Sequence, residues 1–423
     1  MAFQFDQVKN ALDTTEHFEQ VIGTPWYRDA VYENFSDAEY QRRYTLLREK
    51  MAARGVDCVI APGSGSNWSY GAGMSWLSGL AYHAGMAQYV VFPREGAPTL
   101  ICAEGGATLE AIRRSVVIQD VRSSRGGQYA QVIAARIKEL GLQNGRIGFL
   151  ECTPRRVEDV MPYNHFQELA ERLPDASIVI LTGLIHELLH VKSAEEIEAV
   201  KRAGALLDLA FDVMLQTAKP GTTEREVMAA ATAAVLAEGG ECEFMIIGST
   251  PSGAPAMPFG NIRPSGRVLQ KGDVIVNELA AGIQGYTVQM GNPICIGEPA
   301  PAVRRFWEEI VQPGFNLLAE YMRPGIALEE IKQAGRFYRD HGCQGRALLL
   351  HGIDTITSHP LISVNKVVGS DFERTLKPGM TVMLEPDPIT ADGLLGMFVG
   401  RTFVITENGG YSVTKFPVEL PVV

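Results

Sequence analysis

The segment GDVIVNELAAGIQGYTVQM, residues 272–290, constrains the fold of this chain more than any other part of the sequence. The apolar run Val274–Val276 and the later residues 286–288 read as two β-strands, and glycines between them indicate a turn. Glu278 and Gln289 stand eleven residues apart, a spacing that a tight hairpin brings into one pocket. The segment therefore predicts a hairpin that carries a carboxylate and a carboxamide to a common site.

Length and composition indicate a globular protein of two domains. The chain has 423 residues, of which 46% are hydrophobic and 21% charged, so it can bury more than one core. The formal net charge is -11 and the isoelectric point is near 5.3. This acidic balance argues against nucleic acid and anionic membrane surfaces as main partners.

The sequence also favours a cytoplasmic location. No apolar run reaches the roughly 18 uncharged residues that a membrane-spanning helix requires. The N-terminal stretch MAFQFDQVKNALDTTEHFEQ carries acidic residues and lacks the apolar core of an export signal. The six cysteines are scattered singly without a Cys-x-x-Cys pair, as is typical of reduced thiols.

The first part of the chain reads as an α/β domain. After a polar and aromatic lead-in, residues 36–55 carry a helical pattern with Ser36 as its N-cap and Gly55 as its stop. Short apolar runs then alternate with helical stretches, and no glycine-rich phosphate loop follows any of these runs. We predict an α/β domain over residues 1–187 that includes an N-terminal extension and has no nucleotide site.

A second domain is predicted over residues 188–423. It opens with a helix for which Ser193 is the N-cap and Glu196 completes a capping box. A second helix, several strand-like pieces and a helix-rich stretch over residues 301–341 follow, before strands and turns resume.

Several segments of this second domain resemble one superfamily. His351-Gly352 and His359-Pro360 lie in ALLLHGIDTITSHPLI, Glu385 lies in LKPGMTVMLEPDPI, and GRTFVITENGG comes near the end. With the hairpin and the Lys-Ser-x-x-Glu-Ile start of the first helix, they resemble methionine aminopeptidase, proline-specific peptidases and creatinase. The resemblance implies a creatinase-type α/β N-terminal domain, an α+β pita-bread catalytic domain, and a homodimer.

The positions that hold metal ions in the peptidases of this superfamily are altered here. They read Glu278, Gln289, His351, Glu385 and Gly400-Arg401, whereas a two-metal site needs about five ligands, mostly carboxylates. Glycine offers no ligand, an arginine repels a cation, and a carboxamide is a weak ligand. We therefore expect no metal cofactor, with a single divalent ion as the alternative.

The altered positions make creatinase and ectoine hydrolase the nearest functional resemblance. The expected activity is that of a metal-independent hydrolase or lyase that cleaves a C–N or related bond of a small polar molecule. His351, Glu278 and Glu385 are the predicted catalytic residues, because two carboxylates beside an imidazole can divide acid and base roles. Creatinase carries a catalytic histidine where this chain has Met257-Pro258, so that mechanism does not transfer intact.

Two other functions stay open at this point. One is a divergent metal-dependent Xaa-Pro aminopeptidase or dipeptidase, and the other is a catalytically inactive pita-bread protein that binds a ligand. Glu278 and Glu385 each end an apolar run, where a structural salt bridge to Arg401 or another basic residue is the alternative to a catalytic role. Arg401 either neutralises such a carboxylate or clamps a substrate carboxylate.

The remaining candidates are predicted to bind substrate. The stretch Ser66 to Gly85 gathers aromatic residues among glycines and, in creatinase-like dimers, reaches toward the partner's active site. Packing in a core is the alternative for these aromatic residues, as it is for Tyr286. The predicted substrate-binding residues are Gln289, His359, Arg401, Tyr286, Trp68, Tyr82 and His83.

Overall fold

The computed structural model divides into two compact units, Met1–Leu188 and Leu189–Val423. None of the helices among its described residues is long and apolar enough to cross a membrane. The predicted substrate-binding residues Trp68, Tyr82 and His83 lie outside the described residues. The structure describes residues 33–64, 72–80, 86–150, 161–345, 348–355, 357–363, 367–368 and 374–423.

The first unit is built on a six-stranded sheet in the order β4-β3-β2-β1-β5-β6. β2 pairs antiparallel with β1 and β3, and the other three pairings are parallel. Parallel neighbours require crossovers, and helices supply them along the chain. The strands are β1 (Cys58–Ser64), β2 (Ala87–Pro93), β3 (Thr99–Cys102), β4 (Asp120–Ser123), β5 (Arg146–Phe149) and β6 (Ser177–Ile180).

Helices of this unit bury the apolar side chains of the central strands. Ile60, Val91 and Ile101 from three strands pack with Ile133 and Leu169 from two helices in one core. Ser36 is the N-cap of the first described helix, as predicted, and its hydroxyl accepts from the Glu39 backbone N–H at 3.1 Å. The helices are α3 (Asp37–Ala53), α4 (Ala72–Ser78), α5 (Gly106–Ser115), α6 (Tyr129–Glu139) and α7 (Tyr163–Arg172).

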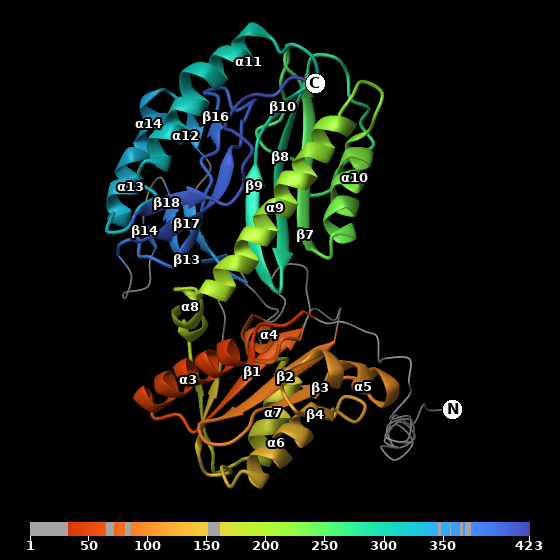
Figure 1. Cartoon of the computed structure of the whole chain (residues 1–423), viewed down its shortest axis with the longest axis vertical. Coiled ribbons are helices and arrows are strands. Elements are labelled where there is room, and N and C mark those ends of the chain that lie inside the picture. The colour runs from red at the N-terminus through yellow and green to blue at the C-terminus, as the bar shows by residue number, and fades with distance from the viewer. Residues whose placement is uncertain are drawn as a thin grey trace. The chain divides into compact units, whose positions relative to one another are not determined.

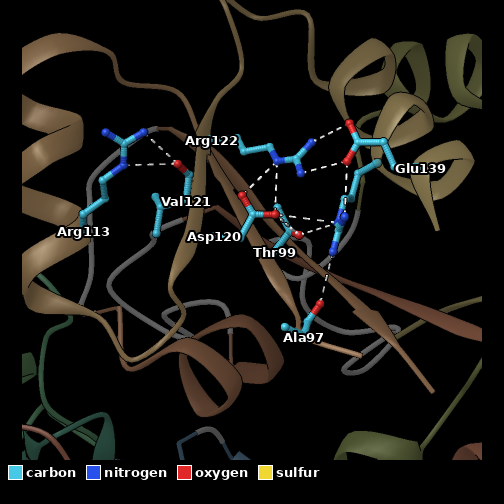
Figure 2. A network of polar contacts seen from close by, with 8 residues as sticks. Ala97, Thr99, Arg113, Asp120, Val121, Arg122 and Glu139 are labelled. Carbon is cyan, nitrogen blue, oxygen red and sulfur yellow. Dashed lines mark hydrogen bonds and ion pairs between the residues drawn. The ribbon is translucent and has the colours of Figure 1, made fainter. Parts of the chain in front are cut away.

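A polar network ties the edge strand β4 to α6 and β3 (Figure 2). Arg122 donates from both terminal nitrogens to Glu139, at 2.9 and 2.8 Å, and from Nε to Asp120 at 2.9 Å. Thr99 donates to the other oxygen of Asp120 at 2.6 Å, and Arg136 donates to the Thr99 hydroxyl. The bidentate contact with Arg122 lowers the pKa of Glu139. The carboxylate therefore stays ionised and keeps its ion pair with the edge strand.

The second unit opens with two long capped helices, after α8 (Leu184–Leu189) at the division between the units. The predicted capping box of α9 (Ala194–Thr217) is confirmed: Ser193 Oγ accepts from the Glu196 N–H at 3.2 Å, and Glu196 accepts from the Ser193 N–H at 2.8 Å. α10 (Glu224–Ala237) follows, capped by Thr223. α9 runs across the strands β8 and β9, as Figure 1 shows.

The predicted hairpin forms the centre of the second sheet. β8 (Asp273–Ile283) and β9 (Tyr286–Gly291) pair antiparallel around a two-residue turn. Gln284 and Gly285 both have positive φ, 52° and 78°, which is the backbone that a twisted two-residue hairpin needs. β7 (Glu241–Pro251) pairs with the other edge of β8.

The full sheet of the second unit has ten strands among the described residues. Its order is β10-β8-β9-β17-β15-β12-β13-β14, with β7 beside β8 and β18 beside β17. All of its pairings are antiparallel. The remaining strands are β10 (Ile294–Cys295), β12 (Leu348–Ile353), β13 (Thr357–Ser363), β14 (Val367–Val368), β15 (Thr381–Leu384), β17 (Gly400–Thr406) and β18 (Gly409–Ser412), while β11 (Gln344–Gly345) and β16 (Pro388–Ile389) pair separately.

A second group of helices covers one face of this sheet. Leu350, Leu384 and Phe403, from three neighbouring strands, pack with Trp307 and Phe315 of these helices in a large core. Together with α9, these helices cover one face of the sheet. The residues of the candidate site lie on the opposite face. This is the predicted pita-bread fold. The helical segments are α11 (Pro301–Phe306), the π-helix Trp307–Val311, α12 (Gln312–Ala319), α13 (Leu328–Ala334) and α14 (Arg336–Asp340).

Candidate active site

A row of paired residues crosses the face of the sheet that lies opposite the helices. His351 on β12 is paired with Met383 on β15, and Met383 with Thr402 on β17. Thr402 Oγ1 then contacts the backbone of Gln289 on β9. Directly opposite residues of antiparallel strands point to the same face, so His351, Met383 and Gln289 face the same side.

The two glutamates lie on that same face. Ala280 is the direct partner of Gln289, and Glu278 lies two residues before Ala280 on β8. Glu385 lies two residues beyond Met383, where its N–H still pairs with β12. Because side chains two residues apart on a strand point to the same face, both carboxylates lie on the face that bears His351 and Gln289. We call the side of the sheet that bears Glu278, Gln289, His351 and Glu385 the site face.

His351 and Glu385 form a buried pair on the site face. His351 Nε2 lies 3.5 Å from Glu385 Oε1, and the two side chains are 3% and 9% exposed. His351 Nδ1 lies 2.8 Å from the carbonyl oxygen of Gly352. A carbonyl oxygen only accepts, so Nδ1 carries a proton and the second ring nitrogen faces the carboxylate.

His351 Nε2 and Glu385 Oε1 are close enough for a proton bound by the pair to lie on either group. If the proton lies on Nε2, the pair is an imidazolium with a carboxylate; if it lies on Glu385, both groups are neutral. Either state leaves one group able to accept and the other able to donate. The pair has the composition that general acid–base catalysis requires.

Apolar side chains fill the space between the strands that carry the glutamates. Gly291 and Gly400 are direct partners on β9 and β17. A Cβ built on Gly291 would lie 2.3 Å from Phe398 Cδ1, and one built on Gly400 would lie 2.4 Å from Met383 Cε. The two glycines therefore make room for an apolar plug, which we define as Val276, Ile353, Met383 and Phe398, with Phe259 packed against them.

Arg401 lies on the helix-covered face, opposite to the site face. It pairs with Leu384 and Met290, both one position away from the site-face row. Its Nη1 donates to the carbonyls of Gly291 at 2.7 Å and Gly400 at 2.8 Å, and Nη2 donates to Asn292 Oδ1 at 2.9 Å. Burial lowers the pKa of Arg401 to about 10. Among the described residues, no salt bridge joins Arg401 to Glu278 or Glu385.

Two further predicted substrate-binding residues have defined places. Tyr286 also faces the helices, where its hydroxyl donates to Glu196 Oε1 of α9 at 2.5 Å, so it packs rather than reaching the site face. His359 lies in β13 beside His351, in a bulge between the pairs His351–Leu361 and Gly352–Ser358. Of the two, His359 lies on the strand next to His351, whereas the contact of Tyr286 turns its side chain to the helices.

The side chains present do not fit a two-metal centre. Across the part of the chain that the structure describes, no three His, Cys, Asp or Glu side chains are grouped so as to hold a metal ion. The site face offers Gln289 where a second carboxylate would be needed, and Gly400 is covered by Met383. Hard divalent ions require several charged oxygen ligands, so we derive no catalytic step through a metal pair.

Each of the two units of the structure matches a known protein family. Residues 43–188 match the creatinase/prolidase N-terminal domain, and residues 198–407 match metallopeptidase family M24. The chain is similar to a probable dipeptidase, PepE, of Mycobacterium bovis, with 31% identity over 279 residues that cover 63% of this chain and 69% of that protein. This chain belongs to metallopeptidase family M24.

Two more relatives of this family member agree with that match. A Xaa-Pro dipeptidase of Pyrococcus furiosus is 26% identical over 268 residues, covering 62% of this chain and 74% of that protein. The crystal structure of dipeptidase PepE from Mycobacterium ulcerans has a TM-score of 0.71 at 26% identity, and it covers 92% of this chain and 100% of that one.

These relatives correct three expectations. The activity expected from the sequence, that of a metal-independent hydrolase or lyase on a non-peptide C–N bond, is wrong because the relatives are named dipeptidases. The placing of a metal-dependent peptidase behind that activity, as an alternative only, is wrong for the same reason. The expected absence of a metal cofactor is contradicted as well, since the matched family is one of metallopeptidases. The altered residues at the metal-ligand positions had favoured a non-peptidase, whereas the similarity of the whole domain indicates a peptidase.

The plug residues Met383 and Phe398 were not recognised in the sequence. Each follows from a contact between strands that are far apart in the chain. The one local signal is the pair of glycines, Gly291 and Gly400, at positions where a side chain would otherwise enter the site face. A glycine inside a strand often marks a close approach of another group.

Proposed function

We propose that this M24 family member hydrolyses the peptide bond of short peptides. The dipeptidases to which it is similar support this activity, and so does the acid–base pair on the site face. The observation that carries the proposal is the buried contact of His351 Nε2 with Glu385 Oε1 in a family M24 fold. A pair of this kind can supply both proton transfers that hydrolysis needs.

The proposed chemistry uses the pair in sequence. In the state with neutral His351 and protonated Glu385, the imidazole accepts a proton from water as the water oxygen bonds to the carbonyl carbon. Glu385 then gives its proton to the leaving nitrogen as the C–N bond breaks, and the pair is restored by transfer from imidazolium to carboxylate. General acid–base steps of this type contribute about 10²- to 10⁴-fold in rate.

A dipeptide panel tests the proposal. Chelator-treated protein is divided, reloaded with manganese, cobalt, zinc or iron or left without metal, and incubated with Xaa-Leu and Xaa-Pro dipeptides. Free amino acids are measured by mass spectrometry, with elemental analysis of each sample. We expect cleavage in at least one condition, and an absence of cleavage in all of them with folded protein would reject a peptidase.

A second candidate function is that of a peptide-binding protein without turnover. The apolar plug over Gly291 and Gly400 favours it, because the plug occupies space between the two glutamates. Calorimetric titration with the same dipeptides separates the candidates. Micromolar binding without product would establish the binding protein, whereas product formation would exclude it.

Assembly and location stay as proposals. A homodimer is supported by the family resemblance, and light scattering of the purified chain checks it. A cytoplasmic location is supported by the thiols, since the cysteines that the structure describes are all free. The free cysteines are Cys58, Cys102, Cys242, Cys295 and Cys343.

A further inference from the structure

Two hydrogen bonds between its backbone and the Thr402 side chain fix Gln289 on the site face. Its N–H donates to Thr402 Oγ1 at 2.9 Å, and the Thr402 hydroxyl donates to the Gln289 carbonyl at 2.9 Å. The threonine side chain thus satisfies both backbone groups of Gln289, between β9 and β17. The residue is 5% exposed, so its side chain has a defined setting.

The carboxamide oxygen of Gln289 is a buried acceptor that lacks a donor. Gln289 Oε1 is shielded from water and has no hydrogen-bond partner among the described residues. An unpaired buried polar atom is costly and uncommon in native proteins. A bound molecule that offers an N–H or O–H group at this point would supply the missing donor.

The surroundings of Gln289 select a neutral donor rather than a cation. Its direct partner Ala280 is apolar, and the apolar plug lies along the same row at Met383. The described residues gather no metal-ligand group around it. A neutral carboxamide does not supply the charge of the second carboxylate that a divalent ion would need, whereas it pairs readily with an amide N–H.

We propose that Gln289 is a specificity-determining residue whose Oε1 accepts a hydrogen bond from the N–H of a secondary amide in the substrate. This assignment rests on the proposed peptidase function and narrows its substrate class. A peptide bond to most residues carries an N–H, whereas a bond to proline carries none. The chain therefore prefers peptides with a secondary amide over prolyl peptides.

The test uses two substrates that differ only in that N–H. Ala-Leu and its analogue with an N-methylated peptide nitrogen are compared as substrates of the wild type and of Gln289→Leu. The variant keeps the approximate volume of the side chain and removes the acceptor. We expect kcat/KM of the wild type to favour Ala-Leu by about 10-fold or more, and the ratio to fall toward 1 in Gln289→Leu.

Controls separate this inference from the proposed function. Gln270 is exposed, and Gln270→Leu must keep the wild-type ratio. If turnover is absent, calorimetric binding of the two compounds to the wild type gives the same comparison without chemistry. A melting temperature of Gln289→Leu at or above that of the wild type would agree with removal of an unpaired atom. Equal preference in the wild type, or an unchanged ratio in Gln289→Leu, would overturn the assignment.

Discussion

His351 Nε2 and Glu385 Oε1 lie 3.5 Å apart on the site face, and neither side chain is exposed to more than a tenth of its surface. The Gly352 carbonyl orients the ring by accepting a hydrogen bond from its Nδ1–H group. The two groups therefore lie close enough to act together in proton transfer. This coupling leads to two predictions about activity.

Glu385→Gln is predicted to lower kcat by about 10²-fold or more while the fold is kept. The amide preserves volume and hydrogen bonding but cannot receive the shared proton. Steady-state kinetics and melting temperature are measured on the same preparation. Glu407→Gln is the matched control, because Glu407 is exposed on the turn between β17 and β18. An unchanged kcat would remove Glu385 from the chemistry.

His351→Ala is predicted to remove most activity, because the pair then lacks the group that exchanges a proton with Glu385. His351→Asn should keep substrate binding, since a carboxamide offers a hydrogen bond but moves no proton. A histidine that only packed would behave differently: the alanine variant would melt earlier, and its folded fraction would turn over normally. Steady-state kinetics and melting curves, measured on the same preparation, distinguish the two outcomes.

Gly291→Ala is predicted to destabilise the second unit by about 1–3 kcal/mol. The added methyl group meets the ring of Phe398, whose Cδ1 would lie 2.3 Å away. Phe398 is held in place by an edge-to-face contact with Phe259, with ring centroids 5.5 Å apart. Gly253→Ala serves as the control, because a Cβ there meets nothing within 4 Å. Denaturant unfolding that gave equal stabilities for the two variants would contradict the apolar plug.

Glu39 is predicted to make the first unit sensitive to acid. Burial acts to raise its pKa, but hydrogen bonds from Arg42 and Arg43 outweigh burial and lower the pKa to about 2. The carboxylate is therefore favoured in the folded state. Its contribution is fully present above the ordinary carboxyl value of 4.5 and is lost as pH falls toward 2.

Glu39→Gln should then cost up to about 3 kcal/mol at neutral pH and progressively less between pH 5 and pH 3. Urea unfolding at several pH values measures this dependence. Glu49→Gln on the same helix is the control, since Glu49 is exposed. A stability loss in Glu39→Gln that stayed constant with falling pH would show that packing, and not charge, is responsible.

Features of the fold that depend on neighbouring residues could be predicted from the sequence. The capping box of Ser193 and Glu196 involves residues three apart, and the hairpin of β8 and β9 depends on a short alternating pattern. The pita-bread architecture followed from the resemblance of several such segments in their order along the chain. Each of these signals involves residues close together in the chain, so it can be recognised in a single sequence.

The faces of the site could not be predicted, because they depend on pairing between distant strands. Arg401 was considered as a partner of Glu278 or Glu385, but its pairing with Leu384 and Met290 turns it to the helices. A shift of one residue in that register would have turned the Arg401 side chain to the site face. The apolar plug and the clamp of Gln289 by Thr402 depend on the same long-range pairing.

The measurement that tests the central claim most directly is peptide cleavage in water labelled with ¹⁸O. The active metal condition from the dipeptide panel is used, with wild-type protein and with Glu385→Gln. If the chain is a peptidase that works through the His351–Glu385 pair, the new carboxyl group of the wild-type product carries one ¹⁸O atom, and the variant forms almost no product. Product without ¹⁸O, or labelled product formed equally fast by Glu385→Gln, would contradict the account.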